Sequence, residues 1–318
     1  MNRREFVQGV VGATTVNNSF LAFAVQSKPP RQIAYYLDQS AGPAAAFGVQ
    51  AIERACEKKG VGLRRVQVID DTLADYLLVI SCRSDQASPV RQLSTQLGAP
   101  SPYGKESFVI QSGMVGNKNI ALVCGADALA LAYALYSIAD LIETSESPQS
   151  ALMALRNQSE SPAVRDRSLS MYTMQQAYFE SRLFDETFWD VYLNNLVRNR
   201  FNNFSLLFAY ESSGFLAPPY PWFFELPEFP EVKAAGVTPE AMQRYLHALN
   251  RIIAMTHERG LRFTLGIWDH IYDGHSSYYT NGVWDHLPII NGRRPRWPVE
   301  GLTDSNLVAY TPKTVHKD

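Results

Sequence analysis

Polar and aromatic residues follow two of the predicted strands in the second half of the chain. Tyr210 and Glu211 come just after the apolar run 203–208, and the later run 261–268 ends in Trp268 and continues into Asp269 and His270. Aromatic rings pack against the flat C–H faces of sugars, and carboxylates and imidazoles bond to the hydroxyl edges. These residue types therefore predict a site for a polar, ring-shaped ligand, and a sugar fits them.

Two loops after these strands supply further aromatic rings. Trp222 lies within the aromatic segment 220–224, and Trp284 lies in the long loop that follows His270. Loops at the ends of barrel strands carry ligand sites, but rings under long loops also fill apolar gaps. We expect packing to account for most single rings and ligand contact to account for some, with Trp222, Trp268 and Trp284 as candidates.

The loop after His270 also invites a metal interpretation. Imidazole and carboxylate groups are common metal ligands, and Asp269, His270 and His275 lie close together in the sequence. Their spacing matches no recognised ligand motif. We therefore expect no metal and no other cofactor, and a metal-dependent hydrolase built on these three residues remains an alternative.

Glu211 and Asp269 follow neighbouring predicted strands and could form a carboxylate pair, the usual device of glycoside cleavage. Neither lies in an apolar context that would raise the pKa of its carboxyl group. We expect both to act as hydrogen-bonding residues, so the catalytic residues stay unassigned.

Strand and helix patterns alternate from Arg167 onwards. A strand is predicted over 167–172, a helix over 186–200 with Asp185 as its N-cap, a strand over 203–208, a helix that begins with Thr238 and Pro239 and ends at Gly260, and a strand over 261–268. This alternation predicts a parallel sheet, as in a TIM-type (β/α)8 barrel. About 50 residues follow Trp268, and a whole barrel needs roughly 250. We expect about three βα units, with the catalytic carboxylates beyond this chain.

The preceding part of the chain predicts a separate small α/β sandwich. Extended runs and helical runs alternate between Gln32 and Glu143. The fold class is thus α/β, with a sandwich domain at 31–146, a polar linker at 147–162 and a partial barrel at 163–318. Cys56, Cys82 and Cys124 are far apart and form no Cys-x-x-Cys motif, so we expect buried free thiols.

The first 30 residues differ from the rest. Arg3 and Arg4 precede a short apolar run and the small-x-small triplet 22–24, which resembles a twin-arginine export signal. The run is too short and polar for a membrane span. We expect a periplasmic or secreted protein. With a net charge of -2 and mixed charges throughout, nucleic acid is not an expected partner.

Several short segments carry a family resemblance. These segments are the runs 106–110 and 120–136, Pro162 before Arg167-Ser168-Leu169, the stretch 199–203 and the region 220–261. Together they resemble the α/β domain and first barrel strands of β-N-acetylhexosaminidases and α-glucuronidases. The resemblance covers most of residues 31–270. It implies that Arg167 bonds to sugar hydroxyls at the cleavage site, and that the catalytic carboxylates follow later strands.

These observations favour the N-terminal part of a secreted glycoside hydrolase that uses carboxylate acid/base chemistry on oligo- or polysaccharides. This part alone is expected to be inactive. The alternative from another class is a carbohydrate-binding protein without a catalytic half.

Overall fold

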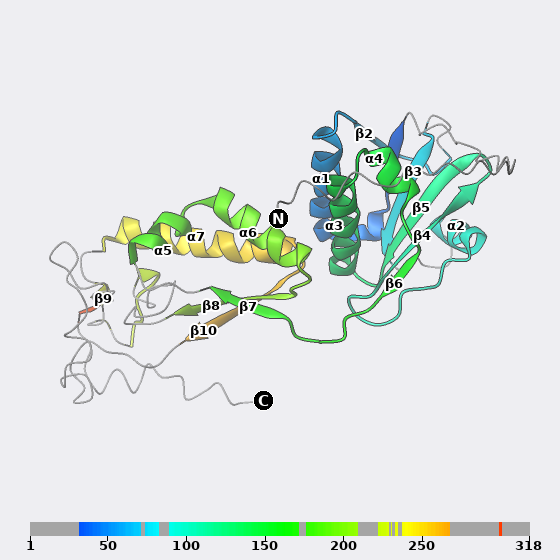
Figure 1. Cartoon of the computed structure of the whole chain (residues 1–318). Helices are drawn as coiled ribbons and strands as arrows, with labels where there is room; N and C mark the ends of the chain where they lie inside the picture. Colours follow the sequence, from blue (N-terminus) through cyan, green and yellow to red (C-terminus); the bar gives the residue numbers. More distant parts are fainter. Residues whose placement is uncertain are drawn as a thin grey trace, which may run out of the picture.

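The computed structural model describes residues 32–70, 74–82, 89–171, 176–208, 222–228, 230, 233–234, 237–267 and 299–300. These residues form two units, each built on a β-sheet with helices against it (Figure 1). The fold class is α/β, as predicted. The segment 1–31 lies outside the described residues, so the export signal stays a prediction. Among the described helices, none has the length and apolar character needed to cross a membrane.

The first unit contains a six-stranded sheet that is mostly parallel. The strand order is β2-β1-β3-β5-β4-β6, in which β2, β1, β3 and β5 are parallel and β4 is antiparallel to both of its neighbours. The bounds are β1 (Ile33–Leu37), β2 (Leu63–Val66), β3 (Tyr76–Cys82), β4 (Phe108–Val115), β5 (Lys118–Gly125) and β6 (Gln158–Glu160). Strand β3 is buried over nearly its whole length, as expected of a strand covered on both faces.

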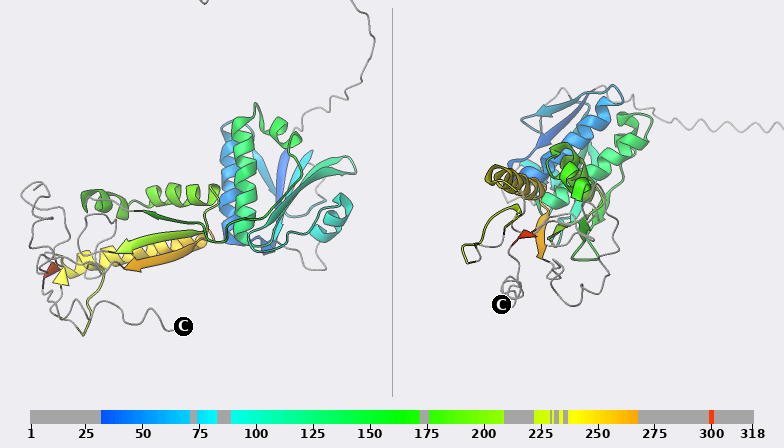
Figure 2. Two further views of the ribbon diagram at one scale, coloured as in Figure 1. Left: turned by 60° about the horizontal axis from the view of Figure 1, so that its bottom comes forward. Right: turned by 90° about the vertical axis from the view of Figure 1, so that its left-hand side faces the viewer.

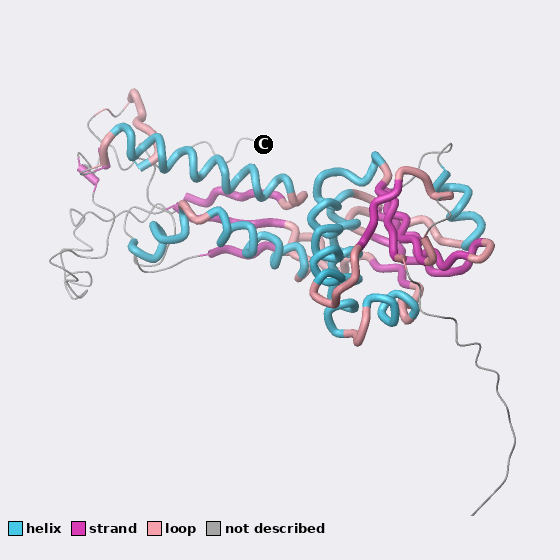
Figure 3. Tube along the Cα trace, turned by 90° about the horizontal axis from the view of Figure 1, so that it is seen from above, coloured by secondary structure: helices cyan, strands magenta, loops and turns pink. Residues whose placement is uncertain are grey.

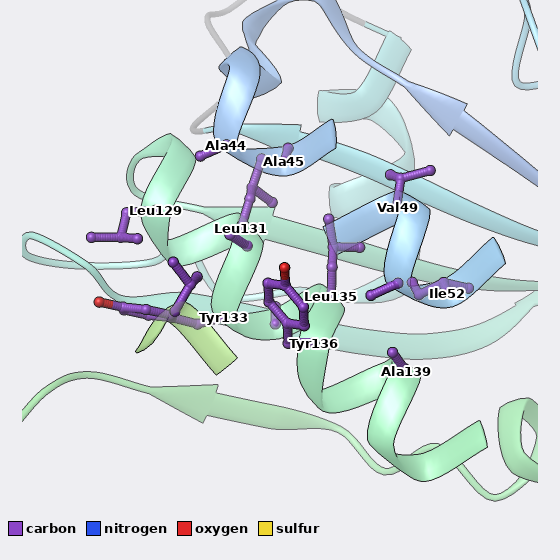
Figure 4. Close-up of a cluster of buried hydrophobic side chains, with 14 of the residues drawn as sticks. Ala44, Ala45, Val49, Ile52, Leu129, Leu131, Tyr133, Leu135, Tyr136 and Ala139 are labelled. Atoms are coloured by element: carbon purple, nitrogen blue, oxygen red, sulfur yellow. The ribbon is translucent and has the colours of Figure 1, made fainter. Parts of the chain in front are cut away.

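Helices cover both faces of this sheet. Helices α1 (Gly42–Glu57) and α3 (Ala128–Thr144) pack against one face, and α2 (Pro89–Leu97) packs against the other (Figures 2 and 3). The short elements η1 (Gln39–Ala41) and α4 (Pro148–Met153) precede α1 and follow α3. Figure 4 shows the buried cluster between α1 and α3. The two helices approach closely at Gly48, where an added Cβ would lie 2.5 Å from the Cβ of Leu135.

The second unit contains a three-stranded parallel sheet of order β10-β8-β7. Its strands are β7 (Ser168–Met171), β8 (Asn203–Phe208) and β10 (Arg262–Ile267), and its helices are α5 (Gln176–Leu183), α6 (Glu186–Arg198) and α7 (Pro239–Glu258). All three helices lie on one side of the sheet (Figure 1). A two-stranded antiparallel ribbon pairs β9 (Lys233–Ala234) with β11 (Val299–Glu300).

The helix ends follow the predicted capping residues. The Asp185 side chain accepts a hydrogen bond from the backbone N–H of Phe188 at 3.0 Å, and the Thr238 hydroxyl accepts one from Ala241 at 3.2 Å. Gly260 follows α7 with a φ of 75°, a left-handed conformation that glycine adopts without strain. These contacts confirm the predicted starts of both helices and the predicted end of α7. They could be predicted from the sequence because capping depends on residues that are close in sequence.

The predicted linker at 147–162 contains regular structure instead. Ser147 caps α4 with a capping box, and β6 adds an edge strand to the first sheet through its pairing with β4. Residues 108–110 of β4 pair with the polar residues of β6, and this pairing makes the polar stretch a strand. Helices α2 and α5 were also not predicted from the sequence. The cysteines are free thiols as expected, with Cys56 and Cys124 buried and Cys82 half-buried.

The two units share one continuous apolar core. Buried residues of α1 and α3 form a single cluster with Trp189 and Leu193 of α6 and with Phe204 of β8. At the turn after α7, a Cβ added to Gly260 would lie 3.3 Å from the Cβ of Leu129 and 3.4 Å from that of Ala44. The N-terminal half of each helix α1 and α3 thus packs directly against the second unit.

Candidate functional site

The parallel strands of the second unit direct the predicted site residues to one edge of the sheet. Ile267 pairs with Phe208, and Met171 pairs with Leu206, so the three strands end side by side. Ligands of parallel α/β sheets bind at this carboxyl edge. Tyr210 and Glu211 follow β8 in the sequence, and Trp268, Asp269, His270 and Trp284 follow β10. These six residues lie outside the described residues, and their roles stay predictions.

The face of the sheet opposite the helices carries a row of hydrogen-bonded polar side chains. The Oγ atoms of Ser168 and Ser205 lie 2.8 Å apart. The Asn203 amide donates to the Ser168 hydroxyl at 2.9 Å, and the Thr264 hydroxyl donates to Asn203 Oδ1 at 3.1 Å. Ser168 and Thr264 are exposed, so this row offers hydroxyl groups to a polar ligand.

The alternation of residues along β8 explains why this face is polar. Phe204 is fully buried and packs against Trp189 and Tyr192 of α6, with ring centres 5.7 Å away in each case. Successive side chains of a strand point to opposite faces, so Asn203 and Ser205 point away from the helices. No described residue of this face except Arg262 is charged, and the described part of the face therefore offers hydrogen bonding without an acid/base carboxylate.

Arg167 lies at the amino end of β7, opposite to the edge where a ligand is expected. Its guanidinium donates to Glu106 and to the Tyr133 hydroxyl of the first unit, and to the carbonyl groups of Val164 and Arg200. Every guanidinium nitrogen has a protein acceptor. In this structure Arg167 joins the two units, and the sugar contact that the family resemblance implied stays a prediction.

Glu106 is the centre of this junction and was not singled out from the sequence. Its side chain is 6% exposed, and it accepts hydrogen bonds from Arg167 and from the Asn202 amide at 3.0 Å. Glu106 has a φ of 60° and Arg200 a φ of 66°, both unusual for residues with side chains. The sequence did place a carboxylate just before the apolar run of β4, which could have marked Glu106 as unusual. The hydrogen-bond partners of its side chain lie 27 to 96 residues away in the chain, so the sequence does not reveal them.

Burial and charge shift the pKa values in this junction. Burial lowers the pKa of Arg167, but its hydrogen bonds with Glu106 and Tyr133 outweigh that effect and raise it. Burial and the neighbouring Glu106 carboxylate raise the pKa of Tyr133. Both groups are therefore held in their usual protonation states, Arg167 charged and Tyr133 neutral, as a structural contact requires.

Trp222 lies within the described residues. It is 2% exposed and belongs to the apolar core. Phe223 is equally buried, and its ring centre lies 6.2 Å from that of Tyr245 in α7. The packing interpretation therefore holds for Trp222 in this structure, because a ring without an exposed face cannot stack on a sugar. The burial of Trp222 in the shared apolar core decides this, and the segment 220–224 alone does not reveal that core.

The alternative metal ligands Asp269, His270 and His275 lie outside the described residues. Within the described ranges, no three His, Cys, Asp or Glu side chains come close enough to hold a metal ion.

No protein-family model matches the sequence, and no curated protein sequence matches it. Among solved structures, the chain is similar to a GH138 enzyme targeting pectin rhamnogalacturonan II, with a TM-score of 0.50 and 16% identity over 72% of this chain and 30% of that one. Matches to CpGH84D (TM-score 0.44, 11% identity, 78% of this chain and 36% of that one) and to Flavobacterium johnsoniae chitobiase (TM-score 0.40, 11% identity, 74% of this chain and 30% of that one) are weaker.

The likeness to the GH138 enzyme concerns the fold. This chain spans about 30% of the length of that enzyme, and its two units together resemble part of a glycoside hydrolase fold.

Proposed function

We propose that this chain is the N-terminal part of a secreted glycoside hydrolase. In this proposal, the second unit is the first section of a (β/α)8 barrel and the first unit is an accessory α/β domain. The substrate is an oligo- or polysaccharide, and carboxylate acid/base chemistry cleaves its glycosidic bond.

The parallel sheet β10-β8-β7 carries this proposal. Its described helices all lie on one face, and its other face presents the hydrogen-bonded row of Ser168, Asn203, Ser205 and Thr264. In a (β/α)8 barrel the helices form the outer ring and the strands line the interior. A one-sided helical layer over parallel strands fits a barrel section, and the fold likeness to part of a GH138 enzyme supports the same interpretation.

The sugar site is proposed at the carboxyl edge of these strands. Tyr210, Glu211, Trp268, Asp269 and His270 follow β8 and β10 directly in the sequence and supply rings and hydrogen-bonding groups. The catalytic carboxylates are proposed to follow later strands, beyond residue 318. Arg167 is left out of the proposed site because it lies at the amino end of β7, opposite to the carboxyl edge, and Trp222 is left out because it is buried.

The first unit is proposed to support the barrel section rather than to act on the substrate at this edge. Its helices α1 and α3 continue the core of the second unit, and Glu106 anchors Arg167 at the amino end of β7. The amino ends of barrel strands contribute to stability, whereas the carboxyl ends carry the chemistry.

Glycan binding by the 318-residue chain tests the proposal. A panel of neutral plant and bacterial oligosaccharides is screened on a glycan array, and the best ligand is titrated by calorimetry. We expect Trp268→Ala to weaken binding about tenfold or more, because it removes a stacking platform, and Thr264→Val to weaken it severalfold. Thr144→Val, at an exposed position in α3, is the control and should bind like the parent chain.

Turnover separates the catalytic proposal from its alternative. Absence of any glycan binding would contradict a sugar site, and hydrolysis of aryl glycosides by residues 1–318 would contradict the placement of the carboxylates. If the chain binds glycans, and a longer protein encoded by the same reading frame also binds them without hydrolysing them, a carbohydrate-binding protein would be favoured. Sequencing the N-terminus of the exported product tests cleavage after the triplet 22–24.

A further inference from the structure

A polar groove of about 550 Å³ lies in the first unit, between α2 and the segment 98–102. Arg91, Ser94 and Thr95 of α2 form one wall, Ser101 lies on the other, and Leu122 and Cys124 of β5 form the floor. Helix α2 is on the side of the first unit that faces away from the second unit (Figures 1 and 2). The groove is therefore separate from the carboxyl edge of β7, β8 and β10.

The two hydroxyl groups of the helix wall are oriented as hydrogen-bond acceptors. The Ser94 hydroxyl donates to the carbonyl of Ala99 at 3.4 Å, and the Thr95 hydroxyl donates to the carbonyl of Arg91 at 3.1 Å. A hydroxyl that gives its proton to a backbone carbonyl keeps lone pairs for an incoming donor. This wall therefore suits a ligand that brings O–H groups.

Arg91 adds a positive charge at one end of the groove. It is the only charged residue of α2, whose sequence is Pro-Val-Arg-Gln-Leu-Ser-Thr-Gln-Leu, and its side chain is exposed. It lies in the first turn, where the helix dipole adds positive potential. A guanidinium at this place suits a carboxylate, which it can bind through two parallel hydrogen bonds.

The opposite wall is rigid and partly apolar. Backbone bonds from Ala99 to the Ser94 carbonyl at 2.9 Å and from Gly98 to the Thr95 carbonyl at 3.2 Å tie this segment to the end of α2. Pro100 and Pro102 restrict its backbone further. Because the wall is formed before a ligand arrives, binding orders few groups and costs little conformational entropy.

We propose that this groove is a second saccharide-binding site, specific for sugars that carry a carboxylate, such as uronic acids. Arg91 binds the carboxylate, Ser94 and Thr95 accept hydrogen bonds from ring hydroxyls, and Pro100 packs against a C–H face. The site lies outside the proposed barrel section and does not depend on the proposed catalysis. It would hold an acidic polysaccharide at a distance from the cleavage site.

The probe is tri-α-1,4-galacturonic acid, titrated into the 318-residue chain by calorimetry. Arg91→Ala is expected to weaken binding at least tenfold, Arg91→Lys to weaken it less, and Thr95→Val to weaken it severalfold. The fully methyl-esterified trisaccharide, which lacks the charge, is expected to bind at least tenfold more weakly than the acid. Circular dichroism and thermal unfolding verify that each variant is folded.

Two controls give the result its specificity. Arg156→Ala removes an exposed arginine between α4 and β6, and Thr144→Val changes an exposed position of α3, so both should leave trigalacturonate binding unchanged. The proposal is overturned if the parent chain does not bind the acid, if Arg91→Ala binds like the parent, or if the methyl ester binds equally well. If tri-glutamate binds as tightly as trigalacturonate, the proposal is also overturned, because the ligand of the groove would then be an acidic peptide and not a saccharide. Loss of binding in Thr264→Val would assign it to the second unit instead.

Discussion

The guanidinium of Arg259, just after α7, lies 4.1 Å from the ring centre of Phe47 in α1. The two residues belong to different units, and Arg259 is 1% exposed. Its nitrogens donate to the Asn194 amide oxygen and to the Met255 carbonyl, each at 2.8 Å, and to the Asp190 carboxylate. Burial lowers the pKa of Arg259, although the nearby Asp190 acts in the opposite direction. A buried cation is tolerated here because each of its three nitrogens donates to a protein acceptor.

Arg259→Ala is expected to lower the free energy of unfolding by about 3 kcal/mol, because it removes a buried cation and its hydrogen bonds to Asn194 and Asp190. Asn194 Oδ1 loses this donor, and the Asp190 carboxylate keeps the bond from the Asn194 amide. Urea unfolding followed by tryptophan fluorescence measures the change. Arg251→Ala is the control, since its ion pairs with Glu186 and Glu258 are partly exposed and contribute less than about 1 kcal/mol. Equal effects of the two substitutions would contradict a special role for Arg259.

Glu106 and Arg167 should be energetically coupled across the junction. Glu106→Gln and Arg167→Gln each remove one charge of a mostly buried pair, with exposed side-chain fractions of 6% and 18%. Each is expected to lower the free energy of unfolding by about 2 to 4 kcal/mol, and a double-mutant cycle should give a coupling of about 1 to 3 kcal/mol. A parallel cycle on Arg251 and Glu258 should stay below about 0.5 kcal/mol. Strict additivity at Glu106 and Arg167 would contradict the ion pair.

Acid should weaken the contact between α3 and α6. The hydrogen bond from Arg198 lowers the pKa of Glu143, with a smaller contribution from Lys58 and a partial opposing effect of burial. A carboxyl group with a lower pKa in the folded state stabilises the protein above its unfolded pKa of about 4.3. That contribution is lost as the pH falls through the folded value.

Glu143→Gln is therefore expected to cost up to about 1 kcal/mol at pH 7 and clearly less at pH 3, below the unfolded pKa of about 4.3. Urea titrations at pH 3, 5 and 7 measure this difference. Glu146→Gln, at an exposed position two residues after α3, is the control and should show no such trend. A cost that is the same at pH 3 and pH 7 would show that the charge of Glu143 does not matter.

Gly48→Ala should destabilise the first unit, although alanine is the better helix former by about 1 kcal/mol. The new Cβ would lie 2.5 Å from the Cβ of Leu135, so α1 and α3 would have to separate. We expect a net loss of about 1 to 3 kcal/mol, measured by thermal unfolding. Gly62→Ala, where an added Cβ meets no atom within 4 Å, should be nearly neutral. A stabilised Gly48→Ala variant would contradict the close contact.

The sheet of the second unit and its polar face were only partly predictable. The alternation of strand and helix from Arg167 to Trp268 predicted parallel strands, and the structure confirms them as β7, β8 and β10. The bonded row of Ser168, Asn203, Ser205 and Thr264 was not predicted, because its members come from three strands and no short window of sequence contains them.

By itself the sequence determined the elements whose signals are local. Asp185 and Thr238 as caps, Gly260 as a stop, and the apolar runs of β3 and β8 act within a few residues, so the corresponding helices and strands follow from them. Tertiary structure alone decided what Arg167 and Trp222 contact. Glu106, the partner of Arg167, and most residues of the apolar core that buries Trp222 are distant in the chain. Only folding brings a carboxylate to Arg167 and an apolar surface to Trp222. The polar stretch 158–160 became a strand for the same reason, since β4 supplies the hydrogen bonds that its own residues do not specify.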